Sequence, residues 1–257
     1  MIHNYELLKK NALKVWSFLN PYPISRYPRF ANTVDIVLLS IIDDELGVLL
    51  IKRKEEPYKD CWALPGGFID VKKDVDALEA AKRELEEETG LNNIFLDQLR
   101  TYTEIFRDPR ELVADETVRV TSIAHFALVD YTKVKAIAGS DAKEVKWFKM
   151  SKLPTVAFDH ETMIDEAIIR IRNRISYTHI GFELVPARFT IPELRETFEK
   201  VLGRKINSAN FRTKLLKLNV LDKTKHKRII GKGQPAPIYT LNQKRLANLP
   251  PGETLFN

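Results

Sequence analysis

The chain has 257 residues, of which 44% are hydrophobic and 30% charged, enough for one large or two ordinary domains with a buried core. No apolar run of 18 or more residues occurs, which argues against a membrane span. The single cysteine excludes an internal disulfide framework and suits a reducing compartment. We therefore expect a cytoplasmic protein without a membrane partner.

The net charge of +6 is divided unevenly along the chain. Residues 185–257 contain 15 Lys/Arg and 5 Asp/Glu, whereas the rest of the chain contains 26 and 30. A basic C-terminal part joined to a mildly acidic body suggests a polyanion as the partner of that part.

The first elements are expected to be a helix, a hairpin and a short strand. Residues 1–30 predict a helix, rather than a signal peptide, and then a Pro-rich connection. Two β-branched runs at 33–42 and 47–53 predict a hairpin, and a strand at 62–70 opens into a loop at Pro65–Gly67.

A helix is expected next, because Asp76 and Glu79 have the spacing of a capping box and Gly90 suits a helix end. Its apolar positions share one face: Leu78, Ala81 and Leu85. Strands are expected at 93–105, 118–131 and 144–150, and a long helix at 159–175. This order predicts an α+β domain at 31–180 with a mixed sheet and helices packed on it.

The order of elements changes in residues 181–257. A helix at 191–203 has Pro192 in its first turn and Gly203 at its end. A second helix is expected at 207–221, with Ser208 as a possible N-cap, and two strands follow at 222–242 around a Gly/Pro loop. Helix, turn, basic helix and basic hairpin are the order of a winged helix-turn-helix domain.

Three carboxylates on the first long helix suggest a metal site. Glu84, Glu87 and Glu88 lie three and four residues apart, so they share a face and repel one another. A divalent cation such as Mg²⁺ or Mn²⁺ would offset that cost, and Arg83 is placed to pair with Glu87. Gly66 and Gly67 allow close backbone approach to a metal or phosphate. The alternative is a solvated acidic face.

The residues "REL" at 83–85 and "EETGL" at 87–91 match the end of the Nudix box, R-E-U-x-E-E-x-G-U, where U is aliphatic. The chain thus resembles Nudix proteins, and the resemblance implies an α/β/α sandwich with a mixed sheet. The resemblance implies metal binding by Glu84, Glu87 and Glu88 and a catalytic set of Glu84, Glu87 and Arg83. Arg83 would act through ion pairs. The reaction would be hydrolysis of a nucleoside diphosphate linked to a further group.

The first half of the box departs from the family pattern. The loop before the helix is two residues longer, and counting back from Arg83 places Val75 where a glutamate is expected. Asp74, Asp76 and Glu79 lie nearby, but none is in register. Metal binding is compatible with this departure, and hydrolysis and ligand sensing both stay open.

Two further segments, "FRDPR" at 106–110 and "VAFDHETMIDEA" at 156–167, resemble segments of Nudix proteins that handle ADP-ribose. Arg107 and Arg110 would hold diphosphate or ribose oxygens. The alternative is a surface turn with a local ion pair. His160 is interpreted equally well as a structural histidine, and we do not expect it to be a catalytic base.

Ten Lys/Arg against one acidic residue in 204–232 favour DNA binding, with the second helix in the major groove and cations on phosphates. The expected contact residues are Asn210, Arg212, Lys214, Lys217, Lys225, Lys227, Arg228 and Lys232. The alternatives are a solvated lysine-rich domain and a module that docks a protein.

A Nudix domain followed by a winged helix resembles the NrtR family of transcriptional regulators. The resemblance implies a homodimer that controls NAD metabolism or, as in some branches of the family, sugar use. Its ligand would be ADP-ribose or a related nucleoside diphosphate, and its partner a double-stranded DNA operator. A Mg²⁺-dependent hydrolase that converts ADP-ribose to AMP and ribose 5-phosphate is the alternative. An adaptor whose basic domain docks a protein is a third reading.

Overall fold

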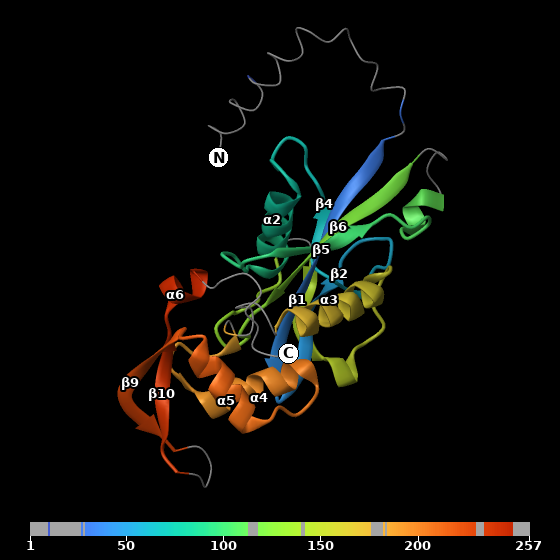
Figure 1. The fold of residues 1–257 in the computed structure, drawn as a ribbon. Helices are drawn as coiled ribbons and strands as arrows, with labels where there is room; N and C mark the ends of the chain where they lie inside the picture. Colours follow the sequence, from blue (N-terminus) through green and yellow to red (C-terminus); the bar gives the residue numbers. More distant parts are fainter. Residues whose placement is uncertain are drawn as a thin grey trace.

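The computed structural model describes residues 29–112, 118–139, 142–175, 184–229 and 234–248, together with Lys10, Tyr27 and Phe182. A layered domain and a smaller domain are visible in Figure 1. The helix expected in residues 1–30 and the boundary expected at 180/181 fall outside the described residues. Among the helices described, none has the length and apolar character needed to cross a membrane.

The larger domain is built on a mixed sheet, as predicted. Its central strand β1 (Phe30–Ile42) runs parallel to β6 (Arg119–Leu128) and antiparallel to β2 (Glu45–Arg53). The strand order is β3-β2-β1-β6-β5, with β4 paired to β1 and β7 paired to β2. The remaining bounds are β3 Trp62–Ala63, β4 Gly66–Phe68, β5 Asp97–Tyr102 and β7 Ala142–Lys149.

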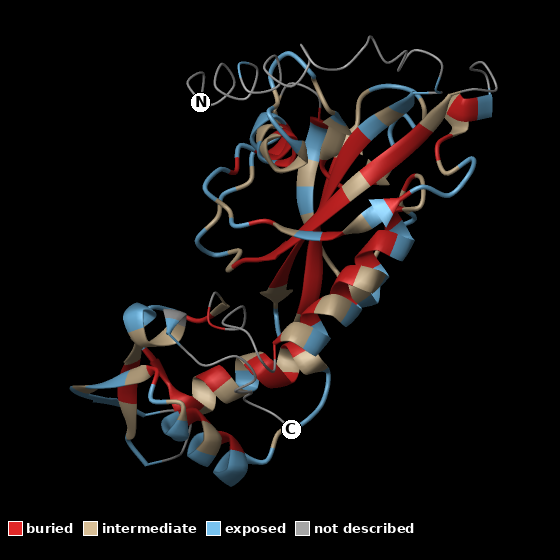
Figure 2. Ribbon diagram, turned by 45° about the horizontal axis from the view of Figure 1, so that its top comes forward, coloured by how far each residue is buried: buried red, intermediate tan, exposed pale blue. Residues whose placement is uncertain are grey.

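Two helices cover the two faces of this sheet. Alternate residues of β1 point to opposite sides, so Val34 and Ile36 pack in one core with α2 (Ala77–Thr89). Val37 lies in a second core with α3 (His160–Arg174). Figure 2 shows the buried strands between helices that each bury one face. The expected α/β/α sandwich is therefore confirmed.

The ends of α2 follow the predicted signals, except that the Glu79 side chain pairs with Lys82 and the expected capping box is only half formed. The Asp76 side chain accepts a hydrogen bond from the Glu79 amide (2.9 Å), and Gly90 ends the helix in the left-handed conformation at φ 69°. The expected loop at Pro65–Gly67 is shorter than predicted, because Gly66 and Gly67 belong to β4. At Gly66 a Cβ would lie 2.2 Å from the Val34 carbonyl oxygen, so only glycine fits this approach.

The smaller domain has the predicted winged-helix order. Its helices are α4 (Ile191–Leu202) and α5 (Ser208–Lys217), and its sheet has the order β8-β10-β9. The strands are β8 Phe189–Thr190, β9 Leu221–Arg228 and β10 Ala236–Leu241, and a short helix α6 (Gln243–Ala247) follows that the sequence did not predict.

One cap in this domain differs from the prediction. Asn207, rather than Ser208, is the N-cap of α5, and its side chain accepts a hydrogen bond from the Asn210 amide (3.0 Å). Both residue types are good caps, so the pattern "NS" did not decide between them. Ser208 is the first residue of the helix.

The two domains share a hydrophobic core. The buried face of α3, with Ile168, Ile171 and then Ile175, belongs to the same cluster as Phe198 and Phe211 of the winged helix. The rings of Phe198 and Phe211 lie 5.7 Å apart, which joins α4 to α5. The winged helix is thus packed on the sheet domain through α3 and α4.

Candidate functional site

A cavity of about 260 Å³ opens between β1, β4, α2 and the start of α3. It brings together six of the residues predicted from the sequence: Gly66, Gly67, Glu84, Glu88, Arg107 and Arg110. Glu87 and Arg83 do not line it. The cavity therefore unites the glycine pair, two box glutamates and the arginine pair.

Arg83 organises the acidic side chains around it. Its Nε and Nη2 atoms donate to the two carboxylate oxygens of Asp74 (2.8 Å each), and Nη1 donates to Glu84 (2.7 Å) and Glu87 (3.0 Å). A further bond from Nη2 reaches the Phe68 carbonyl (3.1 Å). The guanidinium therefore ties the loop before α2 to the helix itself.

Asp74 is a partner that counting along the box could not identify. Its side chain is 3% exposed and also accepts a hydrogen bond from the Asp70 amide (2.8 Å). The two extra residues of the loop fold into a turn that brings Asp74 onto Arg83. Arg83 thus has an acidic partner, although the position where the family pattern expects a glutamate is occupied by Val75, which is 41% exposed.

The three box glutamates separate into two environments. Glu84 and Glu88 are 9% and 6% exposed and face the cavity. The Glu87 side chain is 42% exposed and bound by Arg83. The metal and catalytic roles assigned to Glu87 stay predictions, and the geometry favours Glu84 and Glu88 as the pair that meets a ligand.

Burial and mutual repulsion set the protonation of this pair. Burial, together with the charges of Glu84 and Asp35, raises the pKa of Glu88 to about 8, although the Gly66 amide donates to it at 2.8 Å. Burial also raises the pKa of Glu84, and the bond from Arg83 opposes that rise. Both carboxylates are therefore held where their charge is costly.

These two carboxylates fit a divalent cation. A Cβ at Gly67 would lie 2.5 Å from a Glu84 carboxylate oxygen, so the glycine keeps space at that oxygen open. No group of three or more His, Cys, Asp or Glu is arranged as a cation site within the described ranges. Mg²⁺ is often held by one or two carboxylates plus waters and substrate phosphates, which matches this donor set.

Arginines also line the cavity, and Asp35 and Asp108 lie among them. The Arg107 side chain is 4% exposed and donates from Nε and Nη2 to Asp159 (2.9 and 2.7 Å). Arg110 pairs with Asp108 two residues away and lies 4.6 Å from the Phe68 ring. The local ion pair considered from the sequence is therefore real for Arg110, whereas Arg107 reaches α3.

Arg53 and Phe158 are site residues that the sequence reading missed. The Arg53 guanidinium lies 5.1 Å from the Phe158 ring, and its Nε donates to the Pro57 carbonyl (2.9 Å). Burial and the charge of Arg110 lower the pKa of Arg53. Arg53 ends a strand, so nothing in its local sequence distinguishes it from a surface arginine; only the sheet pairing brings it to the cavity.

His160 is a structural histidine, as one of the two sequence interpretations held. Its Nδ1 accepts a hydrogen bond from the Leu64 amide (2.9 Å), so the proton resides on Nε2, which faces Asp35 at 3.4 Å. Although burial raises the pKa of Asp35, His160, Ser122 and Arg107 outweigh it and lower that pKa. The lone pair of His160 is in use, which argues against a catalytic base.

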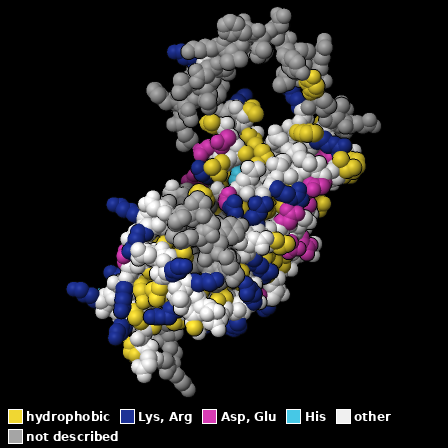
Figure 3. Space-filling model, viewed as in Figure 1, with side chains coloured by type: hydrophobic (Ala, Val, Ile, Leu, Met, Phe, Trp, Pro, Cys, Tyr) yellow, Lys and Arg dark blue, Asp and Glu magenta, His cyan; other side chains and the backbone are white. Residues whose placement is uncertain are grey.

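The predicted DNA-binding residues lie on α5 and β9. Asn210, Arg212 and Lys217 are exposed on α5, and Lys214 is half-buried. Lys225 and Lys227 are exposed on β9. Figure 3 shows many Lys and Arg side chains over this domain. The basic surface fits the expected interface with DNA.

Of the two remaining predicted contacts, one is exposed on β9 and pairs with a residue of α4. Arg228 donates from Nη1 to Glu193 (2.7 Å) at the start of α4, which gives it a structural role. Lys232 lies outside the described residues.

Comparison with known families separates the chain into the same two parts. Residues 31–167 match the NUDIX domain, and residues 181–241 match the NrtR DNA-binding winged helix domain. A protein of Acinetobacter baylyi described as an ADPR responsive transcriptional repressor is 32% identical over 233 residues, which cover 90% of each chain.

Solved structures of a Shewanella oneidensis protein, NrtR, are also similar. Its complex with a 27mer DNA is 32% identical with a TM-score of 0.67, covering 84% of this chain and 95% of that chain. Its NUDIX domain in complex with ADP ribose is 30% identical with a TM-score of 0.51, covering 59% and 94%. Both halves of the chain therefore have structural counterparts.

The role of Asp74 can be tested by removing its charge. We expect Asp74→Asn to lower the free energy of unfolding by about 1.5–3 kcal/mol, because hydrogen bonds to a charged group are lost beside a largely buried arginine. Urea unfolding followed by circular dichroism measures this. Asp76→Asn is the matched control, since asparagine also caps a helix; equal losses in both variants would contradict the role of Asp74.

The raised pKa of Glu88 predicts a pH dependence in metal-free protein. The folded state holds the Glu88 proton to about pH 8, whereas the unfolded state releases it near 4.5. The folded state thus binds more protons in this window, so stability falls as pH rises from about 5 to 8, by at most about 1.4 kcal/mol per pH unit.

Glu88→Gln removes this titration, so we expect its melting temperature in EDTA to rise relative to wild type as pH increases. Glu86→Gln, an exposed change on the same helix, serves as the control. Parallel wild-type and Glu88→Gln curves from pH 5 to 8 would show that Glu88 does not titrate in this way.

Proposed function

Because the chain belongs to the NrtR family, we propose that it is an ADP-ribose-responsive transcriptional repressor. One observation carries the proposal: a cavity lined by box glutamates and by three arginines lies in the same chain as a basic winged helix. The first part suits a metal-bound diphosphate and the second suits duplex DNA.

The chemistry of the cavity supports a nucleoside diphosphate sugar as the ligand. Arg53, Arg107 and Arg110 offer positive charge and hydrogen-bond donors for the diphosphate. A divalent cation on Glu84 and Glu88 would bind the same phosphate oxygens. The NUDIX domain of the S. oneidensis relative was crystallised with ADP ribose, which favours that nucleotide here.

The winged helix supports recognition of duplex DNA. Helix α5 presents Asn210, Arg212 and Lys217 on its exposed side, as a helix that enters a major groove would. The lysines of β9 would contact phosphates. We propose a homodimer that reads two half-sites of an operator, and the family resemblance makes genes of NAD metabolism its targets.

The proposal predicts that ADP-ribose releases the protein from DNA. With Mg²⁺ present, saturating ADP-ribose is expected to weaken DNA binding about 5- to 150-fold, the usual range of coupling between sites. Fluorescence anisotropy with a DNA fragment selected by the protein from a random library measures this. An unchanged DNA affinity, with saturation verified by calorimetry, would contradict the proposal.

Two variants separate the two sites in this experiment. Arg53→Met should raise the ADP-ribose concentration needed for release about tenfold or more, with ligand-free DNA affinity unchanged. Lys217→Ala should weaken DNA binding and reduce the salt slope by about one, unlike Lys152→Ala on the Nudix domain. Salt-independent DNA binding or no DNA binding would favour the adaptor interpretation.

A second function, hydrolysis of ADP-ribose to AMP and ribose 5-phosphate, is favoured by Glu84 and Glu88, which face the cavity. A cation held by them would lower the pKa of an attacking water and offset phosphate charge. Arg83 would position Glu84, and the arginines would orient the diphosphate. A slow hydrolase of this kind is compatible with regulation, since it would clear its own effector.

Hydrolysis predicts that AMP appears when wild-type protein is incubated with ADP-ribose and Mg²⁺. Glu84→Gln is expected to lower turnover about 100-fold or more, because the contribution of a catalytic metal amounts to several kcal/mol. Chromatographic detection of AMP measures the rate, and Glu86→Gln is the matched control. Negligible AMP from wild type, or equal rates in wild type and Glu84→Gln, would end the hydrolase hypothesis.

A further inference from the structure

Helix α3 reaches both the ligand cavity and the winged helix. At its start, Asp159 accepts both hydrogen bonds from Arg107, and His160 is held by the Leu64 amide. At its end, the Arg172 Nε donates to the Val201 carbonyl (3.1 Å) in the last turn of α4. One helix of 15 residues, about 22 Å long, therefore touches both functional parts.

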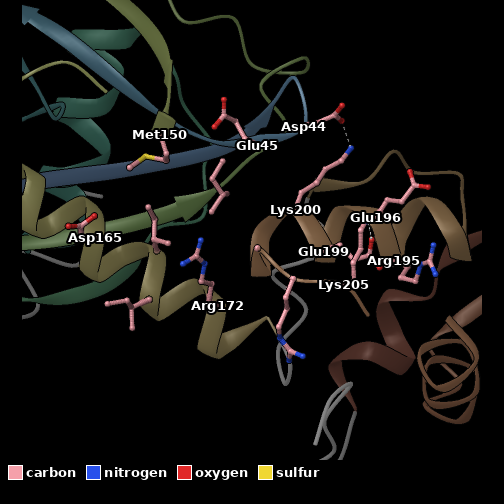
Figure 4. Close-up of a pocket in the computed structure, with 15 residues that line it drawn as sticks. Asp44, Glu45, Met150, Asp165, Arg172, Arg195, Glu196, Glu199, Lys200 and Lys205 are labelled. Carbon is pink, nitrogen blue, oxygen red and sulfur yellow. Dashed lines mark hydrogen bonds and ion pairs between the residues drawn. The ribbon is translucent and has the colours of Figure 1, made fainter. Parts of the chain in front are cut away.

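The end of α3 at the winged helix lies beside a groove. The groove has a volume of about 1190 Å³ and is lined by residues of α3, α4 and the β1–β2 turn. Figure 4 shows Arg172 on one side of it and Lys200 on the other. Lys200 crosses it to pair with Asp44 in the β1–β2 turn (2.7 Å). The groove leaves this side of α4 without close packing, whereas buried residues of α4 such as Phe198 lie in the core shared with α3.

The start of α3 is bound to a residue that a phosphate ligand would engage. Arg107 lines the cavity, and its guanidinium is occupied by the Asp159 carboxylate. A phosphate in the cavity would compete with Asp159 for the same donors, since both are bidentate acceptors of arginine. A bound phosphate would therefore change the contact at Asp159, the N-cap of α3.

We propose that α3 transmits the state of the cavity to the winged helix. The Arg107–Asp159 pair responds to the ligand at the start of α3. At its end, the Arg172–Val201 hydrogen bond and the nearby Lys200–Asp44 pair carry the change to α4. Because Phe198 and Phe211 join α4 to α5, a shift of α4 moves the DNA-reading helix. The ligand acts by its different affinities for the two placements of α3.

This inference rests on the proposed function, and its test measures coupling rather than binding. The coupling factor is the DNA dissociation constant with saturating ADP-ribose divided by the constant without it, determined on the full chain. Arg172→Ala is expected to reduce this factor at least about threefold, while ADP-ribose affinity in the absence of DNA stays within about twofold of wild type.

Arg170→Ala is the matched control, because Arg170 lies on the same helix but bonds to the Leu99 carbonyl of the sheet domain (3.2 Å). Asp44→Lys should also reduce the factor, and the exchange Asp44→Lys with Lys200→Asp should restore it. That rescue distinguishes transmission from a loss of folding, which melting temperatures monitor.

The outcomes separate the two claims. A wild-type response that Arg172→Ala and Asp44→Lys both retain in full would overturn transmission through α3 and leave the proposed function intact. If the DNA affinity of the wild-type protein does not change when ADP-ribose is bound, both transmission through α3 and the proposed function are overturned. A factor reduced in Arg172→Ala and Asp44→Lys, kept in Arg170→Ala and restored by the exchange supports the proposal.

Discussion

The gathering of carboxylates around the last turns of α2 is the constraint on which the site depends. Glu84, Glu87 and Glu88 follow one another within five residues, and like charges at that spacing destabilise a helix. Arg83 relieves part of this repulsion by binding Asp74, Glu84 and Glu87 at once. It also donates to the Phe68 carbonyl, so the same side chain holds β4 and the loop between β4 and α2 against the helix.

Glu88 is not bound by Arg83 and instead contacts the backbone of β4. It faces the Gly66 amide, in a strand that approaches β1 so closely that no side chain fits at Gly66. Arginines also line the cavity, and one of them, Arg107, is bound to Asp159 at the N-cap of α3. The cavity is thus linked to the helix that shares a core with the winged helix.

Local signals in the sequence predicted most of the fold. The cap at Asp76, the helix end at Gly90 and the β-branched run of β1 each depend on neighbouring residues, so the sequence alone predicts them. The winged-helix order and the box glutamates were also identified from the sequence. Asp74 was not, because its role depends on how a lengthened loop folds. Arg53 was not, because only strand pairing brings it beside Phe158 and Arg110.

The spacing of the glutamates in the sequence also could not predict that Glu87 is exposed while Glu84 and Glu88 are buried. Residues three and four apart share a helix face, yet the exposure of Glu87 and the burial of Glu84 and Glu88 depend on which part of that face the sheet covers. The N-cap of α5 shows the same limit on a smaller scale, since Asn207 and Ser208 are both suitable caps. Tertiary contacts decide such cases.

Within the described part of the chain, no third His, Cys, Asp or Glu completes a cation site with Glu84 and Glu88, and this bears on sensing. Glu84 and Glu88 provide two anionic ligands, fewer than a cation such as Mg²⁺ needs for six oxygens, so waters or phosphate must supply the rest. A diphosphate brings those oxygens and gains from the cation in return, and we infer that cation and nucleotide bind cooperatively. By linkage each raises the affinity for the other by the same factor. The cation then binds tightly only together with the nucleotide, so occupancy of the cavity follows the nucleotide concentration. A ligand sensor needs this property, whether or not the nucleotide is then hydrolysed.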